Sequence, residues 1–174
     1  FGNEIGMPAA GTTDHDTVLS WARSGAAGID AAFKQLEFGG LLTKNTSLAI
    51  VHNWFVNSQK VAAAAGLSLT AYEGGISLTT TRYPTAEQGE VQAFFAKLVE
   101  DPRMGDLYTK MVNDFVDSGG TSFLAYNDAQ RGGTSGNWGM LSSIYDDSSP
   151  RYDALTAALA SKAHSALNSA GGKT

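Results

Sequence analysis

The 174-residue chain contains no cysteine, few charged side chains and no long apolar run. The lack of cysteine excludes a disulfide framework, a thiolate metal site and a cysteine nucleophile. The 12 Lys and Arg residues against 17 Asp and Glu residues give a net charge of −5, which argues against nucleic acid as the main partner. No segment approaches the roughly 18 to 20 apolar residues of a membrane helix, so we expect no membrane partner.

What the chain does contain is glycine, at 20 positions, together with abundant serine and threonine. Such a composition indicates a neutral, hydrogen-bonding surface that suits uncharged polar ligands, sugars among them. The length predicts one α/β domain over residues 1–168 and a flexible tail over 169–174. Residues 1–6 lack the basic and apolar regions of a signal peptide, and there is no initiator Met. We therefore expect the chain to begin inside something longer or to have been processed.

Apolar residues at helical spacing predict a series of amphipathic helices. The first begins at Asp14 or Asp16. Thr85, followed by Gln88, is typical of a capping box, and Asp101 before Pro102 predicts another helix start. The expected apolar stripes lie in residues 29–36, 48–62, 91–98 and 104–115, and a last helix runs from about 150 to 167.

Two segments alternate as β-strands do. Residues 67–73 alternate strictly before Gly74-Gly75, residues 121–128 predict a second strand, and 76–84 and 127–149 are expected to be loops. Strands separated by helices favour parallel βα units. A complete (β/α)8 barrel needs about 250 residues, so the expected fold class is α/β, as the C-terminal portion of a TIM barrel.

Four short motifs occur in a suggestive order: Tyr72-Glu73-Gly74-Gly75, Asp101-Pro102-Arg103-Met104, Asn127-Asp128 and Gly136-Asn137-Trp138-Gly139. Together they resemble the C-terminal part of bacterial (β/α)8 proteins related to retaining clan A glycoside hydrolases, some of which are named only as cellulose-binding proteins. The resemblance implies that Phe1-Gly2 ends strand six, that 67–73 is strand seven and that 121–128 is strand eight. It also implies a secreted or extracellular protein that hydrolyses or binds β-linked, cellulose-type polysaccharide and needs no cofactor.

The resemblance places a nucleophilic glutamate on Glu73, at the end of strand seven. Chemistry in such barrels sits at the C-terminal ends of strands, and the following glycines would leave the carboxylate exposed in a cleft. The alternative is a strand-terminal carboxylate that binds a neighbouring loop and has no chemical role.

A retaining glycosidase needs a second carboxyl group about 5 to 5.5 Å from the nucleophile. Asn3-Glu4 has the dipeptide that the family carries at its acid/base. The chain between Glu4 and Glu73 is too short for the further βαβ units, which take about 30 or more residues each. We therefore expect Glu4 to be a loop residue after strand six and the acid/base to lie outside this chain, with Glu4 kept as a candidate.

Four more residues are candidates for sugar binding. Trp138, in a polar loop, is expected to stack on a sugar face, with flanking glycines that admit the ligand; the alternative is a Trp that seals the barrel end. Asn127 and Asp128 could bind sugar hydroxyls or cap a turn. Tyr72 alternates away from Glu73, which favours core packing over sugar contact.

The three histidines His15, His52 and His164 show no ligand spacing, so no metal site is expected.

Three functions stay open. The chain could belong to a retaining glycoside hydrolase, it could bind carbohydrate without catalysis, or it could be a barrel fragment completed by another chain or by a segment preceding Phe1.

Overall fold

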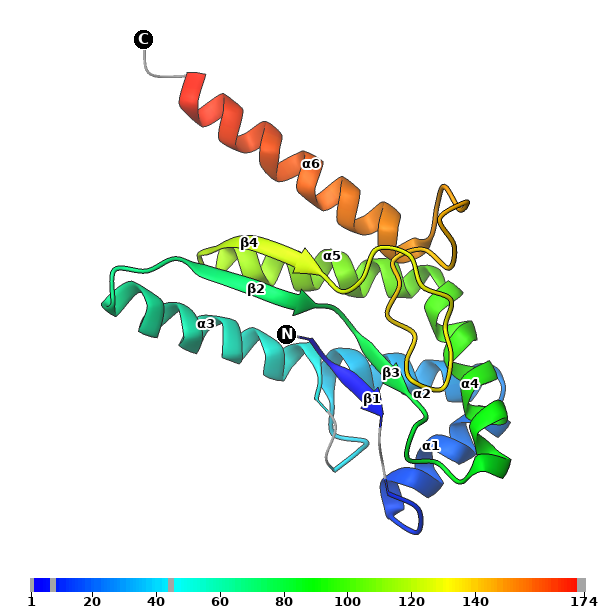
Figure 1. The fold of residues 1–174 in the computed structure, drawn as a ribbon. Helices are drawn as coiled ribbons and strands as arrows, with labels where there is room; N and C mark the ends of the chain where they lie inside the picture. The colour runs from blue at the N-terminus through cyan, green and yellow to red at the C-terminus, as the bar shows by residue number, and fades with distance from the viewer. Residues whose placement is uncertain (1, 7–8, 44–45, 172–174) are drawn as a thin grey trace.

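The computed structural model describes residues 2–6, 9–43 and 46–171, with side chains up to 161. These residues form a mixed α/β fold of helices and short parallel strands (Figure 1). The α/β class expected from the sequence is thus confirmed. In chain order the elements are β1 (Glu4–Gly6), α1 (Thr13–Arg23), α2 (Ala26–Phe38), α3 (Leu48–Ala64), β2 (Leu69–Gly74), β3 (Ser77–Thr79), α4 (Thr85–Glu100), α5 (Pro102–Asp117), β4 (Gly120–Ala125) and α6 (Pro150–Gly171).

The segment from β2 to β3 is the centre of the strand arrangement. Its first half, β2, pairs in parallel with β4, and its second half, β3, pairs in parallel with β1. Three parallel chain segments therefore lie side by side in the order β1, 69–79, β4 (Figure 1). The described residues form two two-stranded sheets and no closed barrel.

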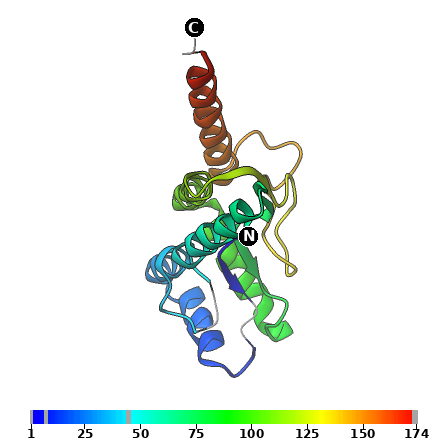
Figure 2. The same ribbon diagram turned by 90° about the vertical axis from the view of Figure 1, so that its left-hand side faces the viewer.

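Helices cover one side of this arrangement (Figure 2). Helix α3 contacts β2, α5 contacts β4, and α2 contacts β1, while α6 packs on α5. One continuous hydrophobic core joins these helices to the strands, which contribute the buried apolar side chains of Ile5, Ala71 and Leu78.

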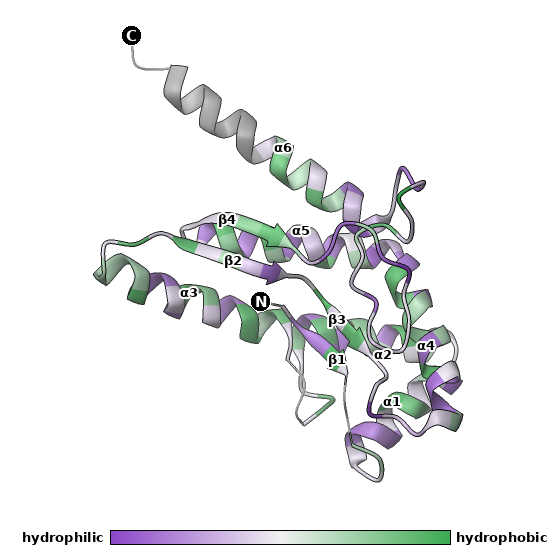
Figure 3. Ribbon diagram, viewed as in Figure 1, coloured by the Kyte–Doolittle hydropathy of each residue, from purple (hydrophilic) through white to green (hydrophobic). Residues whose placement is uncertain are grey.

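Helix α5 shows why the apolar stripes predicted the helices well. Hydrophobic and hydrophilic bands alternate along it in Figure 3, as expected for an amphipathic helix. All six residues of its predicted stripe are buried: Met104, Leu107, Tyr108, Met111, Val112 and Phe115. Asp101 caps this helix as predicted, because its carboxylate accepts a hydrogen bond from the Arg103 backbone N–H at 3.0 Å.

Two predicted helix caps are wrong, although α4 does begin at Thr85 as predicted. Helix α1 is capped by Thr12, whose hydroxyl accepts from the His15 backbone N–H at 3.3 Å, because Asp14 is already within the helix and accepts from Thr43. The predicted capping box at Thr85 is absent. Gln88 instead donates from its side-chain amide to the Tyr83 carbonyl at 2.9 Å.

The strand boundaries also differ from expectation. Strand β2 begins at Leu69 rather than Leu67, and β4 ends at Ala125 rather than Asp128. The predicted loop 76–84 contains β3, which is too short for alternation to reveal. The expected end of strand six at Phe1-Gly2 lies partly outside the described residues, and the strand observed nearby is β1.

At the C-terminus, α6 continues to Gly171, beyond the predicted end near 167 and through part of the expected tail, while residues 172–174 lie outside the described residues. Among the described helices, none is long and apolar enough to cross a membrane.

Candidate functional site

Glu73 lies at a sharp irregularity near the end of β2. Its φ of 55° is in the left-handed region, which costs a non-glycine residue of the order of 1 kcal/mol or more. The pairing of β2 with β4 shifts register between Ala71 and Gly74, as a bulge does. Such a bulge re-aims the side chain, so that Glu73 lines a pocket although the next residue, Gly74, is buried.

The two glycines after Glu73 are each required by close packing. A Cβ on Gly74 would press into the Phe123 ring, and a Cβ on Gly75 would lie 2.9 Å from the Tyr108 hydroxyl. That hydroxyl accepts a hydrogen bond from the Ile76 backbone N–H at 3.1 Å. The glycines therefore let the strand bend over the buried Tyr108 and the partly buried Phe123, and Glu73 lies at this bend.

Trp138 is held above the start of β3 by its neighbours. Its indole N–H donates to the Ser77 hydroxyl at 3.2 Å, and its ring meets the Tyr126 ring edge-on, with centroids 5.7 Å apart. Asn137, the preceding residue, is buried and donates its backbone N–H to the Leu78 carbonyl. These contacts fix the orientation of a half-buried indole ring.

One pocket of about 290 Å³ brings these residues together. Glu73, Gly75, Ile76, Ser77, Tyr126 and Trp138 line it. Two residues proposed from sequence, Glu73 and Trp138, thus meet although they are distant in the chain. The pocket combines a carboxylate, hydroxyl groups and aromatic faces, which is the mixture that a saccharide contacts through its hydroxyls and its CH groups.

The glycines near Trp138 have a different role from the one expected. A Cβ on Gly136 would collide with the indole itself, and a Cβ on Gly139 would collide with the Gln130 and Leu141 backbones. They permit tight packing of the loop rather than access for a ligand.

Asn127 and Asp128 lie at a second pocket of about 390 Å³, between the loop and α6, and do not line the Glu73 pocket. Their backbone groups bind residues 138–141: the Asn127 N–H donates to the Trp138 carbonyl and the Leu141 N–H donates to the Asp128 carbonyl. The Asp128 carboxylate accepts from the Ala129 N–H at 2.8 Å, which is turn capping. These contacts help to place Trp138.

Tyr72 is 73% exposed, so its expected core packing is wrong. The predicted alternation breaks down at this point, because Tyr72 and Glu73 are both exposed and the register of β2 shifts between Ala71 and Gly74. No described residue covers the side chain of Tyr72. It does not line the Glu73 pocket.

Glu4 is a strand residue rather than the expected loop residue. It lies in β1 in register with Ser77, while the following pair, Ile5 and Leu78, is buried. Because side chains alternate along strands, Glu4 and Ser77 share the opposite face. Partial burial raises the pKa of the Glu4 carboxyl. Among the described residues that line the Glu73 pocket, Glu73 is the sole carboxylate.

Sequence reasoning missed Tyr126 and Ser77. The sequence predicts Tyr126 only as part of the strand 121–128 and Ser77 only as part of the loop 76–84, whereas both line the pocket. No grouping of three or more His, Asp or Glu residues suited to a metal ion occurs in the part of the chain that the structure describes.

Comparisons of the chain with protein-family models, with curated proteins and with solved structures found no match. The resemblance to glycoside hydrolases therefore rests on the four motifs alone.

Proposed function

We propose that the Glu73 pocket is the saccharide site of a retaining glycoside hydrolase-like protein that acts on β-linked, cellulose-type polysaccharide, with Glu73 as the nucleophile. The observation that carries this proposal is the convergence of Glu73 and Trp138, from separate motifs, on one pocket. The finer fold assignment, the C-terminal strands of a TIM barrel, belongs to the same proposal. The parallel order β1, 69–79, β4 supports it.

In the proposed reaction the Glu73 carboxylate attacks the anomeric carbon while the glycosidic oxygen leaves with a proton. Water then hydrolyses the glycosyl ester and returns the carboxylate. A second carboxyl group must give the first proton and take one from the water. Within this chain Glu4 is the candidate, since its raised pKa suits a proton donor and its strand neighbour Ser77 lines the pocket.

A second candidate function is carbohydrate binding without catalysis. It is favoured by the presence of a single carboxylate among the described lining residues of the pocket. One preparation assayed both for binding to insoluble cellulose and for hydrolysis of soluble β-glycans separates the two functions.

We expect Glu73→Gln to abolish hydrolysis while binding persists, and Trp138→Ala to weaken binding by about tenfold through loss of the aromatic face. Glu37→Gln on α2 and Trp54→Ala, a half-exposed Trp on α3, are the matched controls and should leave both activities unchanged. Unchanged hydrolysis by Glu73→Gln would exclude the nucleophile role. Binding without turnover by the unaltered chain would favour the second candidate, and the absence of both activities would refute the saccharide site.

We further propose that the partner of the uncovered sheet face is the rest of the barrel, as a separate chain or a missing segment. Tyr72 in β2, Leu124 in β4 and Tyr126 directly after β4 are 73%, 53% and 39% exposed. In a closed barrel such side chains fill the interior. A monodisperse monomer in light scattering, with one cooperative unfolding transition, would contradict this proposal.

A further inference from the structure

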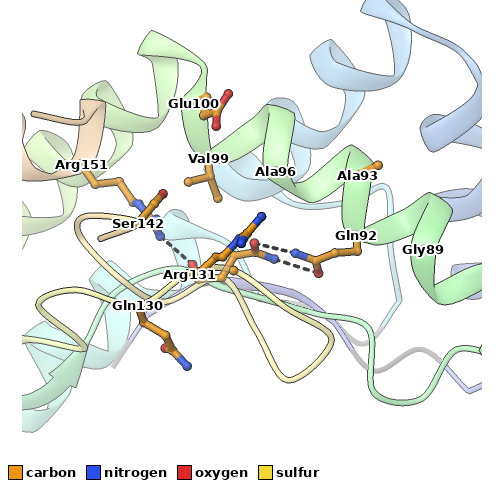
Figure 4. A pocket seen from close by; sticks show the side chains of 12 residues that line it. Gly89, Gln92, Ala93, Ala96, Val99, Glu100, Gln130, Arg131, Ser142 and Arg151 are labelled. Atoms are coloured by element: carbon orange, nitrogen blue, oxygen red, sulfur yellow. Dashed lines mark hydrogen bonds between the residues drawn. The ribbon is translucent and has the colours of Figure 1, made fainter. Parts of the chain in front are cut away.

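A third pocket, of about 480 Å³ and lined mainly by polar residues, lies between α4 and the loop that follows β4 (Figure 4). Its α4 wall is formed by Gln92 and small residues such as Ala93, and its other wall comes from the 130–142 segment and from Arg151 at the start of α6. It shares no lining residue with the Glu73 pocket. Asn137 and Trp138, adjacent in the chain, line the two different pockets.

Arg151 is the unusual feature of this pocket. The residue is only 3% exposed, and one guanidinium N–H donates to the Asn137 carbonyl at 2.6 Å. Its Nε atom is buried without a hydrogen-bond partner, and the ion pairs found among the described residues do not include it. A buried cation without an anionic partner is costly, because it has given up its hydration without compensation.

The loss of hydration also affects the pKa of Arg151. Burial lowers the pKa of its guanidinium, although the nearby Tyr108 hydroxyl acts in the opposite direction. An anion in the pocket would supply the missing partner and offset that cost.

Arg131 adds a second guanidinium to the same pocket. It is exposed, and no hydrogen bond or ion pair to another described residue is found for it. Figure 4 shows Arg131 approaching from the loop and Arg151 from α6. Glu100 is the one acidic residue among the described lining residues, so two cations face one exposed carboxylate.

Two neutral side chains of the pocket, those of Gln92 and Asn137, already have hydrogen-bond partners. Gln92 and Asn137 bind each other side chain to side chain, with N–O distances of 2.9 and 3.3 Å. Each therefore satisfies part of the other's hydrogen-bonding capacity, whereas the Arg151 Nε atom and the Arg131 guanidinium have no hydrogen-bond partner among the described residues.

We propose that this pocket binds an oxyanion, a carboxylate or a phosphate group, between the guanidinium groups of Arg131 and Arg151. Planar guanidinium groups match both kinds of anion through paired N–H donors. The proposal is independent of the saccharide site.

Calorimetric titration of the whole chain with inorganic phosphate and, separately, with glucuronate tests the proposal, with glucose as the neutral comparison. We expect saturable binding of at least one anion and none of glucose at this pocket. Binding of phosphate alone would identify a phosphate site, and binding of glucuronate alone a sugar-acid site.

Two variants locate the binding. Arg131→Gln removes one cation, and Ala93→Trp fills the pocket from α4 without a change of charge. Each should weaken binding by about tenfold or more, which corresponds to ~1.4 kcal/mol. Their matched controls are Arg82→Gln, an exposed Arg that does not line the pocket, and Ala86→Trp, an exposed Ala on α4. Circular dichroism checks that all four fold.

Trp138→Ala should leave anion binding unchanged, so failure of the saccharide site would not affect this test. The proposal is overturned if neither anion binds saturably, or if the control variants weaken binding as much as Arg131→Gln and Ala93→Trp do.

Discussion

Replacement of Phe115 by alanine should destabilise the protein more than most single changes, because this ring joins the helices to the sheet. Phe115 is 1% exposed on α5. Its ring packs edge-on against Phe55 of α3, with centroids 5.3 Å apart, and against Phe123 of β4, with centroids 5.5 Å apart. Gly120 lies so close that any side chain there would collide with the ring.

The expected loss follows from the burial and from the two ring contacts. Truncation of a buried Phe to Ala typically costs about 3–5 kcal/mol. Each aromatic pair contributes about 0.5–1.5 kcal/mol beyond its buried area, which places Phe115 in the upper half of that range. Total domain stability is commonly about 5–15 kcal/mol, so Phe115→Ala should remove a large part of it.

Urea unfolding followed by circular dichroism measures the change in free energy of unfolding. Phe38→Ala is the matched control, because Phe38 is 64% exposed and should change stability by no more than about 0.5 kcal/mol. A loss below about 1.5 kcal/mol for Phe115→Ala, or equal losses for both variants, would refute the packing argument. The explanation of the bend at Glu73 would then be weakened as well, because the Phe123 ring that Phe115 contacts also packs against Gly74.

Two further predictions concern ion pairs at helix starts. His15 is buried and binds Asp16 and Glu87 at 2.9 and 2.7 Å, and its hydrogen bonds to these carboxylates raise its pKa, chiefly the one to Asp16. The resulting stability should be present below about pH 6.5, the pKa expected in the unfolded chain, and lost as the pH rises through the raised folded value. Urea midpoints of the unaltered chain should therefore fall relative to those of His15→Gln between pH 6 and 9, and parallel profiles would contradict this. Asp101→Ala should cost about 0.5–2 kcal/mol through loss of the α5 cap. Hydrogen bonds from Arg103 hold the pKa of Asp101 below its usual value, so this contribution should decline as the pH falls through that lowered value, and an Asp101→Ala penalty that is the same at pH 7 and pH 2.5 would contradict it.

The order and faces of the helices were determined by the sequence itself. The stripe of α5 has helical period and every member is buried, because an amphipathic helix needs only one apolar partner surface and its own periodicity selects the face. The cap at Asp101 is equally local, since it depends on one side chain and the N–H two residues later. The alternation of residues 67–73 likewise identified β2, because the two-residue period of a strand is a local property of the sequence.

The tertiary structure alone decided which helices, strands and loops contact one another. Strand β3 has three residues and becomes a strand only because β1 lies beside it. Glu73 and Trp138 share a pocket because Asn137 binds β3 and because the backbone at Glu73 turns left-handed. Tyr72 is exposed because no described element covers its face of β2, and Arg151 is buried because α6 begins against the loop that follows β4. Contacts between residues distant in the chain have no period in the sequence, so local pattern cannot show them.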